Sequence, residues 1–413
     1  MFRIHPQAEL YLPGRRLPLD ATAEDLSQDG CVRFILPKPV GDAVPQLLTC
    51  LARGQEFCIG QATGQPAERS GEAGFFQCSS SGTTAAPKLI RRSHRSWIAS
   101  FEVNSRLWDL GPADVYAVVG GLQHSLSLYA LIEGLHIGAR VSILSDLTPR
   151  RQWVELQGIQ PTVLYVTPTQ LRQLGDAAGD TSLPSLRRLS VGGGFLDEET
   201  KCRAAQMFPA ARISVFYGAS ETSFVTISDD TCPPSSIGRA YPGVEIRIST
   251  PEGADCGPGE IGLIWVQSPY LFHGYAAGQS PDTRWRDGYL TVGDLGYRDG
   301  RGNLFLTGRI NRMFTVADQN VCPEEIEAFL REQPNVSQAA VLPRQDPKRG
   351  AVPVAFVDAA LGRQGLADLQ AECRRKLGTM KAPRKLIRLK DWPRLSSGKT
   401  DLRQLAQRLE ELT

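Results

Sequence analysis

Residues 79–88 combine hydroxyl groups, a glycine and a lysine, in the order Ser79-Ser80-Ser81-Gly82-Thr83-Thr84-Ala85-Ala86-Pro87-Lys88. Hydroxyls and main-chain N–H groups can surround phosphate oxygens, a glycine lets the backbone approach closely, and a lysine balances the negative charge. The segment lacks the Gly-Lys-Ser/Thr ending of a Walker loop. It therefore predicts a phosphate-binding loop of another kind, and the alternative is a surface turn rich in Ser and Thr.

Further segments carry residue types suited to binding a nucleotide. They are Tyr217-Gly218-Ala219-Ser220-Glu221, Tyr289-Leu290-Thr291-Val292-Gly293-Asp294-Leu295, Gly308-Arg309-Ile310-Asn311, and Pro393-Arg394-Leu395-Ser396-Ser397-Gly398-Lys399-Thr400-Asp401-Leu402. In this order and spacing, the segments resemble the signature motifs of the adenylate-forming superfamily. That superfamily contains acyl- and aryl-CoA synthetases, the adenylation domains of nonribosomal peptide synthetases, and luciferases. The resemblance runs from about residue 76 to residue 405, is nearest to aryl- and acyl-acid ligases, and extends to weaker segments at 192–194, 259–261, 274–275 and 320–327.

The segment 217–221 holds two side chains with direct roles in binding a nucleotide. Tyr217 ends a predicted buried strand and offers a flat ring on which adenine can stack, whereas the alternative is an ordinary core tyrosine. Glu221 supplies the hard oxygen ligand that Mg²⁺ prefers, and a plain surface glutamate is the alternative. The resemblance favours the nucleotide roles and makes Glu221 the metal ligand.

An acidic residue and a basic residue are the predicted ligands of the ribose of ATP. Asp294 follows a predicted strand, where its carboxylate can accept both ribose hydroxyls, and a turn-capping aspartate is the alternative. Arg309 resembles the family arginine that also holds the ribose. The resemblance thus implies an ATP site made of Ser80, Ser81, Gly82, Thr83, Thr84, Lys88, Tyr217, Gly218, Ala219, Ser220, Asp294, Arg309 and Lys399.

Lys399 is the predicted catalytic residue, with a solvated lysine as the alternative. Negative charge grows between the acid and the α-phosphate as pyrophosphate leaves, so a cation brought in at that moment stabilises the transition state more than the ground state. In the family this lysine is carried by a small C-terminal domain that turns about a hinge, which corresponds to Asn311 here. Thr83, Lys88 and Glu221 complete the catalytic set that the resemblance implies.

His124 and Ser125 fall where the resemblance places a wall of the acid pocket, together with Gly192, Gly193 and Gly194. Amino-acid-activating relatives have an Asp at the position of Ser125, which pairs with the substrate ammonium group. An uncharged hydroxyl cannot repay the desolvation of that charge, so we expect an acid without an α-amino group. A buried structural histidine is the alternative for His124.

Some features depart from the family pattern. Ala85 replaces the usual glycine of the phosphate loop. The segment Val316-Ala317-Asp318 lacks the glycine common near the point where a pantetheine thiol arrives, which makes thioester formation a weaker expectation than adenylation. The phosphate loop also begins earlier in the chain than in typical relatives, so we expect an abbreviated first subdomain.

Composition excludes several other classes of protein. The 413 residues hold 46 basic and 44 acidic side chains, and a net charge of +2 gives no field for binding nucleic acid. The short basic run Arg91-Arg92 is expected on a solvated face. No window approaches the ~18 apolar residues of a membrane span, no signal peptide is evident, and the cysteines lack metal-ligand or disulfide spacing. We therefore expect a cytoplasmic protein.

The hydrophobic pattern predicts the elements that position these motifs. Short apolar runs at 115–119, 140–144, 162–166, 188–191 and 213–217 alternate with helical spacing at 127–136, 150–158 and 169–177. This alternation is typical of parallel strands with helical crossovers, and hence of an α/β fold of layered sheets. Before residue 70, only 32–36 reads clearly as a strand.

The hydrophobic pattern changes after about residue 237. Runs at 244–248 and 262–266, separated by Gly- and Pro-rich turns, favour a small β-rich subdomain at about 237–308. An amphipathic helix at 323–332 and a strand at 339–342 favour a separate α+β unit. We therefore predict an N-terminal AMP-binding domain at 1–310 and a small mobile C-terminal domain at 311–413, which carries Lys399.

The resemblance implies that an aryl or acyl carboxylic acid and ATP, with Mg²⁺, give an acyl-adenylate and pyrophosphate. Transfer to the thiol of coenzyme A, or to the phosphopantetheine of an acyl or aryl carrier protein, follows. One alternative is an amide-forming ligase, in which an amine attacks the adenylate. Another is a non-catalytic protein that binds a nucleotide or acyl-adenylate, but such a protein would not need the swinging Lys399 beside Glu221, Asp294 and Arg309.

Overall fold

The computed structural model describes residues 1–19, 32–60, 73–80, 88–233, 235–395 and 399–411. The chain forms two compact units, one with the described residues of 1–246 and 266–280, and the other with those of 247–265 and 281–413. The predicted boundary between residues 310 and 311 lies inside the second unit and stays a prediction. Ser81, Gly82, Thr83 and Thr84 of the predicted phosphate loop lie outside the described residues.

A nine-stranded sheet forms the centre of the first unit. Its strands lie in the order β13 (Arg239–Ala240), β12 (Ser223–Ile227), β11 (Arg212–Ala219), β10 (Arg188–Gly192), β9 (Val163–Val166), β7 (Val115–Val118), β8 (Arg140–Ile143), β1 (Glu9–Leu12) and β2 (Arg15–Leu17). From β11 to β1 all neighbours are parallel, whereas β2, β12 and β13 add antiparallel edges. The predicted α/β fold is confirmed, with each of the five predicted strands found within two residues of its expected ends.

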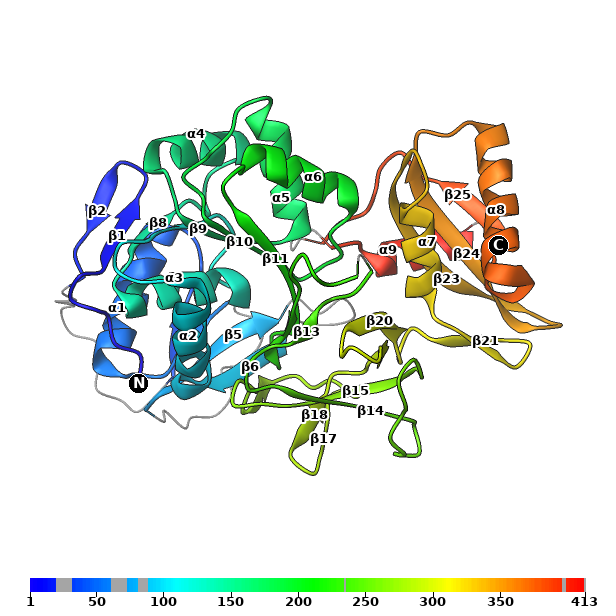
Figure 1. Cartoon of the computed structure of the whole chain (residues 1–413), viewed down its shortest axis with the longest axis horizontal. Coiled ribbons are helices and arrows are strands. Elements are labelled where there is room, and N and C mark those ends of the chain that lie inside the picture. The colour runs from blue at the N-terminus through cyan, green and yellow to red at the C-terminus, as the bar shows by residue number, and fades with distance from the viewer. Residues whose placement is uncertain (20–31, 61–72, 81–87, 234, 396–398, 412–413) are drawn as a thin grey trace. The chain divides into compact units, whose positions relative to one another are not determined.

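Helices cover both faces of this sheet (Figure 1). On one face lie α2 (His94–Trp108) and α3 (Ser125–Ile137), and on the other lie α4 (Pro149–Ile159), α5 (Pro168–Ala178) and α6 (Glu198–Met207). Trp153 of α4 and Leu171 of α5 are buried in one apolar cluster with Leu164 and Val191 of the sheet. The N-termini of α4 and α5 follow from their sequence, since each has a proline in its first turn and Thr167 forms a capping box with Gln170 before α5.

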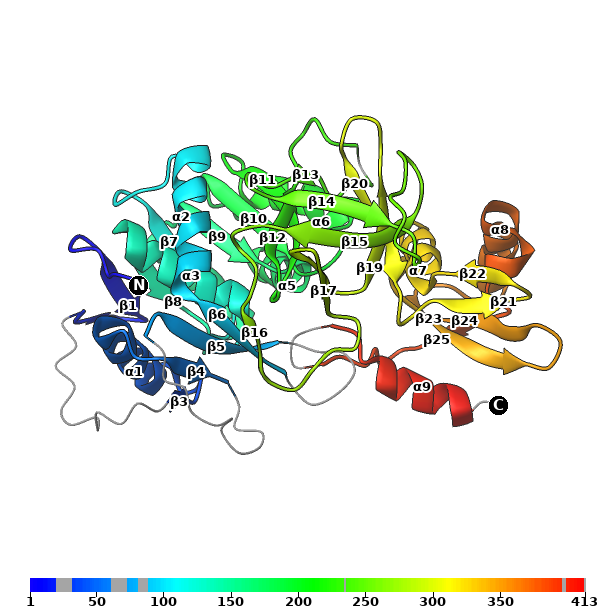
Figure 2. The same cartoon turned by 90° about the horizontal axis from the view of Figure 1, so that it is seen from below.

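A second sheet of this unit lies in the order β16 (Gly274–Ala277), β6 (Lys88–Ser93), β5 (Phe75–Ser80), β4 (Phe57–Ile59) and β3 (Arg33–Ile35). Helix α1 (Val40–Arg53) connects β3 to β4 and lies beside them (Figure 2). Strands β5 and β6 are antiparallel, and Ser80 pairs with Lys88. The described ends of the predicted phosphate loop, Ser80 and Lys88, therefore lie on two paired strands.

In the second unit, one sheet contains β17 (Arg284–Arg286), β18 (Tyr289–Thr291), β15 (Gly262–Gln267), β19 (Asp294–Arg298) and β20 (Leu304–Arg309), with β14 (Glu245–Ser249) also paired to β15. Another contains β22 (Gln319–Val321), β21 (Phe314–Val316), β24 (Gly350–Ala359), β23 (Val336–Asp346) and β25 (Lys385–Arg388), packed with α7 (Pro323–Arg331), α8 (Arg363–Lys381) and α9 (Leu402–Glu411). Strands therefore occur within the stretch 237–308, although β13 and β16 of that stretch pair with strands of the first unit, and the predicted subdomain bounds stay predictions. No helix in the described part of the chain is long and apolar enough to cross a bilayer.

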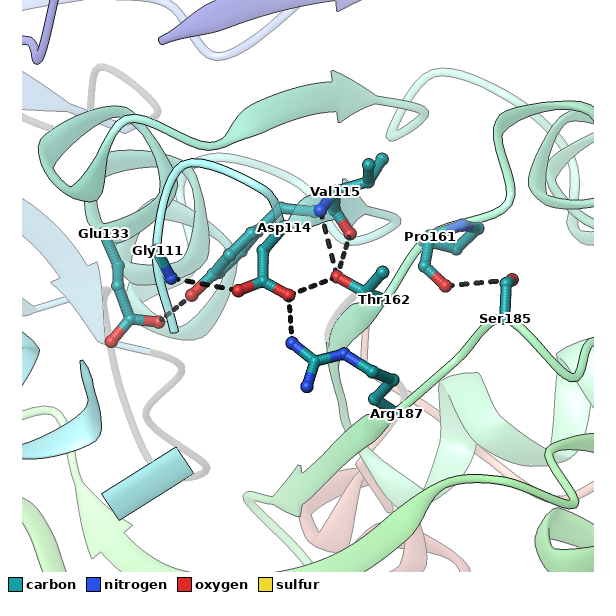
Figure 3. Close-up of polar contacts among 9 residues, drawn as sticks. Gly111, Asp114, Val115, Glu133, Pro161, Thr162, Ser185 and Arg187 are labelled. Atoms are coloured by element: carbon teal, nitrogen blue, oxygen red, sulfur yellow. Dashed lines mark hydrogen bonds and ion pairs between the residues drawn. The ribbon is translucent and has the colours of Figure 1, made fainter. Parts of the chain in front are cut away.

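Polar side chains join the amino ends of three neighbouring parallel strands in the large sheet (Figure 3). Asp114 precedes β7, Thr162 precedes β9 and Arg187 precedes β10. Asp114 Oδ1 accepts hydrogen bonds from Thr162 Oγ1 at 2.6 Å and from Arg187 at 2.7 Å, while Oδ2 accepts one from the main-chain N–H of Gly111 at 3.0 Å. Asp114 is only 2% exposed, so these bonds replace its contacts with water.

A buried carboxyl group lies between this sheet and α3. Glu133 is fully buried and accepts hydrogen bonds from Asn104, Tyr116, Tyr129 and Tyr165 at 2.7 to 3.3 Å. Burial raises the pKa of Glu133 from 4.5 to about 7, although the four donors favour its ionised form. This group therefore changes protonation close to neutral pH while remaining inside the core.

Candidate active site

The predicted acid-binding residues lie at the carboxyl edge of the large sheet. The chain passes from β7 to β8 on one side and then to β9 on the other side of β7, so the strand order reverses there. Open α/β sheets bind ligands outside the carboxyl ends of their strands at such a reversal. His124 and Ser125 follow β7 at this edge, and Gly192 ends β10 on the same side of the sheet. The sheet thus carries residues from distant parts of the sequence to one edge.

The three glycines after β10 differ in their surroundings. A Cβ atom on Gly192 would lie 2.2 Å from the ring of Phe216, so the glycine leaves space for that ring. Gly193 has a φ of 82° and is exposed, as is Gly194. Phe216 was not among the predicted site residues, although its place directly before Tyr217 is a signal that its side chain reaches the same edge.

Tyr217 lies within β11 and does not end it, because the strand continues to Ala219. The prediction that this tyrosine ends a buried strand is therefore wrong, and its side chain is half-buried. A β-bulge occurs between Tyr217 and Gly218, and a Cβ atom on Gly218 would lie 1.9 Å from the carbonyl oxygen of Ser223. Close approach of the two strands explains the glycine at this position.

Three predicted segments meet beside the turn that follows β11. Ser125 Oγ lies 2.7 Å from Ser220 Oγ, so the start of α3 is bonded directly to the turn. His124 precedes α3 and forms a main-chain bridge with Ser79, near the end of β5. The structure therefore brings Ser125 next to the 217–221 segment and His124 next to the strand that leads into the predicted phosphate loop.

Glu221 is held by a tyrosine from another strand. The Tyr275 hydroxyl, on β16, donates a hydrogen bond to Glu221 Oε1 at 2.7 Å. Lys88 Nζ lies 5.8 Å from the centroid of the same ring, within the range of a cation–π contact. The sequence pattern included Tyr275 in a weak motif but gave it no role. Its ring now links the predicted metal ligand to the predicted phosphate-binding lysine.

The donor set fits a magnesium ion that is bound mainly through ATP. Within the described residues, no group of three or more His, Cys, Asp and Glu side chains could hold a metal. Magnesium is commonly held by one or two carboxylates together with water and substrate phosphates. Glu221 could supply the carboxylate, because Tyr275 orients one of its oxygens and the carboxylate has a second.

The expected solvated face at Arg91-Arg92 is wrong. Arg92 is 1% exposed, and Arg91 forms an ion pair with the buried Glu56, with Nε 2.9 Å from Oε1. The missed signal is the alternation along β6, which places Arg92 on the same face as the buried Ile90. An arginine on the buried face of a strand needs hydrogen-bonding partners inside the protein, because burying an unpaired charge raises the free energy of the folded state.

The second unit holds the remaining predicted residues. Asp294 is 4% exposed and forms an ion pair with Arg309, whose Nε lies 2.8 Å from Oδ1. This contact places the two predicted ribose ligands side by side. Asn311, the predicted hinge residue, is exposed and donates a hydrogen bond from Nδ2 to Asp282 at 2.7 Å.

Lys399 is exposed and follows residues 396–398, which lie outside the described part of the chain. Its carbonyl oxygen accepts a hydrogen bond from the N–H of Leu395 at 2.8 Å, and Trp392 Nε1 donates to Thr400 Oγ1 at 3.0 Å. The main chain of Lys399 is therefore hydrogen-bonded to Leu395, and the side chain of the next residue, Thr400, is hydrogen-bonded to Trp392.

Comparison with known proteins identifies the family to which the chain is similar. A family model described as "AMP-binding enzyme" matches residues 26–276, and one described as "AMP-binding enzyme C-terminal domain" matches residues 325–399. The chain is 36% identical over 342 residues to the uncharacterized acyl–CoA ligase YhfT of Bacillus subtilis (strain 168), covering 82% of this chain and 69% of that protein. It is 29% identical to the salicyl-AMP ligase / salicyl-S-ArCP synthetase of Mycobacterium tuberculosis (strain ATCC 25618 / H37Rv), covering 86% of this chain and 65% of that protein.

A solved structure shares the fold. The o-succinylbenzoate CoA synthetase (MenE) of Bacillus subtilis, in complex with the acyl-adenylate intermediate OSB-AMP, superposes with a TM-score of 0.81 at 20% identity, covering 96% of this chain and 94% of that chain. The chain spans about two thirds of the length of the two curated relatives above. Both family models and the 36% identical relative lead to the same conclusion: this chain belongs to the family of AMP-binding enzymes.

Proposed function

We propose that this protein activates a carboxylic acid with ATP. A carboxylate oxygen attacks the α-phosphorus, a new O–P bond forms, and the bond to the β-phosphate breaks, so that pyrophosphate leaves with the electron pair. The products are an acyl-adenylate and pyrophosphate. The observation that carries the proposal is the turn after β11, where Ser220 is bonded to Ser125 and Glu221 to Tyr275, at the ligand-binding edge of the sheet.

Each part of the reaction has a candidate group. Tyr217 offers a half-buried ring for adenine, and Asp294 and Arg309 form a pair that can exchange partners with the ribose hydroxyls. Bound Mg²⁺ would neutralise phosphate charge, with Glu221 as its carboxylate ligand. Lys399 supplies the cation for the charge that grows on the reacting oxygens, and it enters from a predicted mobile domain at 311–413.

The acid is an aryl or acyl acid without an α-amino group. Ser125 offers a hydroxyl that is already bonded to Ser220, and a hydroxyl in this position gives no charge to balance an ammonium group. The salicyl-AMP ligase among the relatives acts on an acid of this class. The acyl group then passes to the thiol of coenzyme A or of a carrier-protein phosphopantetheine, and the names of both relatives support a thiol acceptor.

The test is acid-dependent exchange of pyrophosphate into ATP, measured over a panel of aryl, acyl and amino acids. We expect exchange with a non-amino acid, and a loss of roughly 10²–10³-fold in Lys399→Ala, because a cation that acts only in the transition state is removed. Exchange that requires an α-amino acid would overturn the substrate class. ATP binding without exchange for any acid would overturn the enzyme assignment and favour a nucleotide-binding protein.

A second measurement separates the acceptors. The adenylate formed with the best acid is offered coenzyme A, a phosphopantetheinylated carrier protein, or simple amines, and the products are separated by mass. A thioester supports the proposed transfer. An amide formed without a thiol intermediate would replace it with amide-bond formation.

A further inference from the structure

The strongest unexplained feature of the first unit is a buried arginine behind the 217–221 segment. Arg92 lies on β6 and is 1% exposed. Its guanidinium group donates to the carbonyl oxygen of Ser220 at 2.6 Å, to the carbonyl oxygen of Tyr270, and to Ser96 Oγ at 3.1 Å. The arginine therefore connects β6 to the turn after β11 and to the segment that leads into β16.

The partners of Arg92 make this connection specific. Glu221 follows Ser220, and its carbonyl oxygen accepts a hydrogen bond from the N–H of Phe272 at 2.8 Å. Consecutive carbonyl groups of the turn are thus fixed, one by Arg92 and the next by the segment that Arg92 also binds through Tyr270. A fork of N–H donors suits this geometry, since lysine would offer a single point of charge.

The hydrogen bond to Ser220 also has an electrostatic consequence. The carbonyl group of Ser220 and the N–H of Glu221 belong to one planar trans peptide, so they point in opposite directions. A charge-assisted bond to the carbonyl oxygen polarises the peptide and makes its N–H a stronger donor. Burial lowers the pKa of Arg92 to about 10, so the side chain still carries its charge at neutral pH.

We propose that Arg92 is a positioning residue for adenylation, which fixes the peptide joining Ser220 and Glu221 so that its N–H faces the anionic oxygens of the reacting phosphate. This inference rests on the proposed function. Charge on those oxygens grows as the reaction proceeds, and a donor fixed in advance stabilises the transition state more than bound ATP. Removing Arg92 therefore lowers kcat far more than it raises KM.

The test compares Arg92→Met with Arg188→Met. Arg188 is also a buried arginine, 4% exposed, but it lies at the amino end of β10 and stacks on Trp108, with its guanidinium carbon 3.7 Å from the ring centroid. Both variants remove a buried charge from the same unit, so Arg188→Met controls for lost stability. A further variant, Arg92→Lys, keeps the positive charge but loses the planar set of N–H donors that bonds to Ser220, Tyr270 and Ser96 together.

We expect Arg92→Met to lower kcat for pyrophosphate exchange by roughly 10–100-fold while KM for ATP changes less than about threefold, and Arg92→Lys to lie between it and the wild type. Arg188→Met keeps the wild-type kcat. Hydrogen exchange should quicken in the peptide covering residues 216–224 only in the Arg92 variants. Equal loss of kcat in the Arg92→Met and Arg188→Met proteins, or wild-type kcat in Arg92→Met, would overturn the proposal.

Two outcomes keep this inference separate from the proposed function. If the wild type shows no acid-dependent exchange, the proposed function fails, and hydrogen exchange at 216–224 then decides whether Arg92 fixes the turn. If Arg92→Met does not fold, Arg92→Lys carries the comparison, and wild-type kcat in that variant would show that the fork is not required.

Discussion

The two edges of the large parallel sheet use polar residues in opposite ways. At the amino edge, Asp114, Thr162 and Arg187 bond to one another, and the central carboxylate is almost fully buried. At the carboxyl edge, Tyr217 and Glu221 are only half-buried, and exposed glycines follow β10. The central carboxylate of the amino edge is thus used within the protein, whereas the carboxyl edge leaves Tyr217 and Glu221 partly exposed, where we propose that the ligand binds. Changes at the amino edge should therefore lower stability, and changes at the carboxyl edge should lower activity.

The largest expected effect is at Glu221. Glu221→Gln keeps the shape of the side chain and an oxygen that can accept the Tyr275 hydrogen bond, but it replaces the carboxylate of the proposed magnesium ligand with an amide. We expect the rate of pyrophosphate exchange to fall roughly 10²–10³-fold, with little change in the midpoint of thermal unfolding. A marked drop in that midpoint with unchanged exchange would reverse the comparison between the edges.

The matching change at the amino edge is Asp114→Ala. It removes the acceptor shared by Thr162, Arg187 and the N–H of Gly111, so we expect the free energy of unfolding to fall by about 3 kcal/mol. Urea unfolding measures this loss, and kcat of the folded fraction should stay at the wild-type value. Arg187→Met should lower stability by less than about 1 kcal/mol, because the arginine side chain is 52% exposed. An Asp114→Ala protein with full stability but reduced kcat would contradict the structural role of this edge.

The sequence predicted the strands of the large sheet better than the contacts between its loops, and the reason is physical. Parallel strands and their helices are set by local hydrophobic period, so 115–119 and 188–191 matched β7 and β10 closely. Contacts between loops depend on which strands become neighbours. The bond between Ser125 and Ser220 joins positions 95 residues apart, and no local pattern gives it.

The wrong and missing predictions also have physical causes, which lie in single strands and helices. Charge type alone predicts a solvated face for Arg92, whereas the alternation of buried and half-buried residues along β6 places its side chain inside the protein. The first seventy residues yielded only one strand, since β1, β2 and β4 are each three or four residues long and α1 contains Pro45. Short strands take their stability from their neighbours and leave little periodic signal of their own.

The pH dependence of the free energy of unfolding tests the buried carboxyl group of Glu133, which lies in the interior between the two edges. The folded-state pKa of Glu133 is raised from 4.5 to about 7, so the folded protein binds more protons than the unfolded chain between these values. The stability from this group is fully present below pH 4.5 and is lost as the pH rises through about 7. We expect Glu133 to contribute a loss on the order of 3 kcal/mol as the pH rises through this window, measured by urea unfolding at a series of pH values. Glu133→Gln should lack that part of the slope, and an identical slope in both proteins would show that Glu133 titrates normally.

The smallest expected effect comes from removing one hydroxyl at each edge. Ser125 is half-buried at the carboxyl edge and bonds to Ser220, while Ser185 is half-buried near the amino edge and donates to the carbonyl oxygen of Pro161 at 3.1 Å (Figure 3). Either change to alanine should lower the free energy of unfolding by about 1 kcal/mol, because each removes one hydrogen bond. Only Ser125→Ala should slow pyrophosphate exchange, by roughly two- to tenfold, since Ser220 then loses the partner that fixes its hydroxyl. Equal exchange rates in the two alanine variants would mean that the contact between Ser125 and Ser220 contributes only to stability. Of the two carboxyl-edge residues tested, only Glu221 would then affect activity.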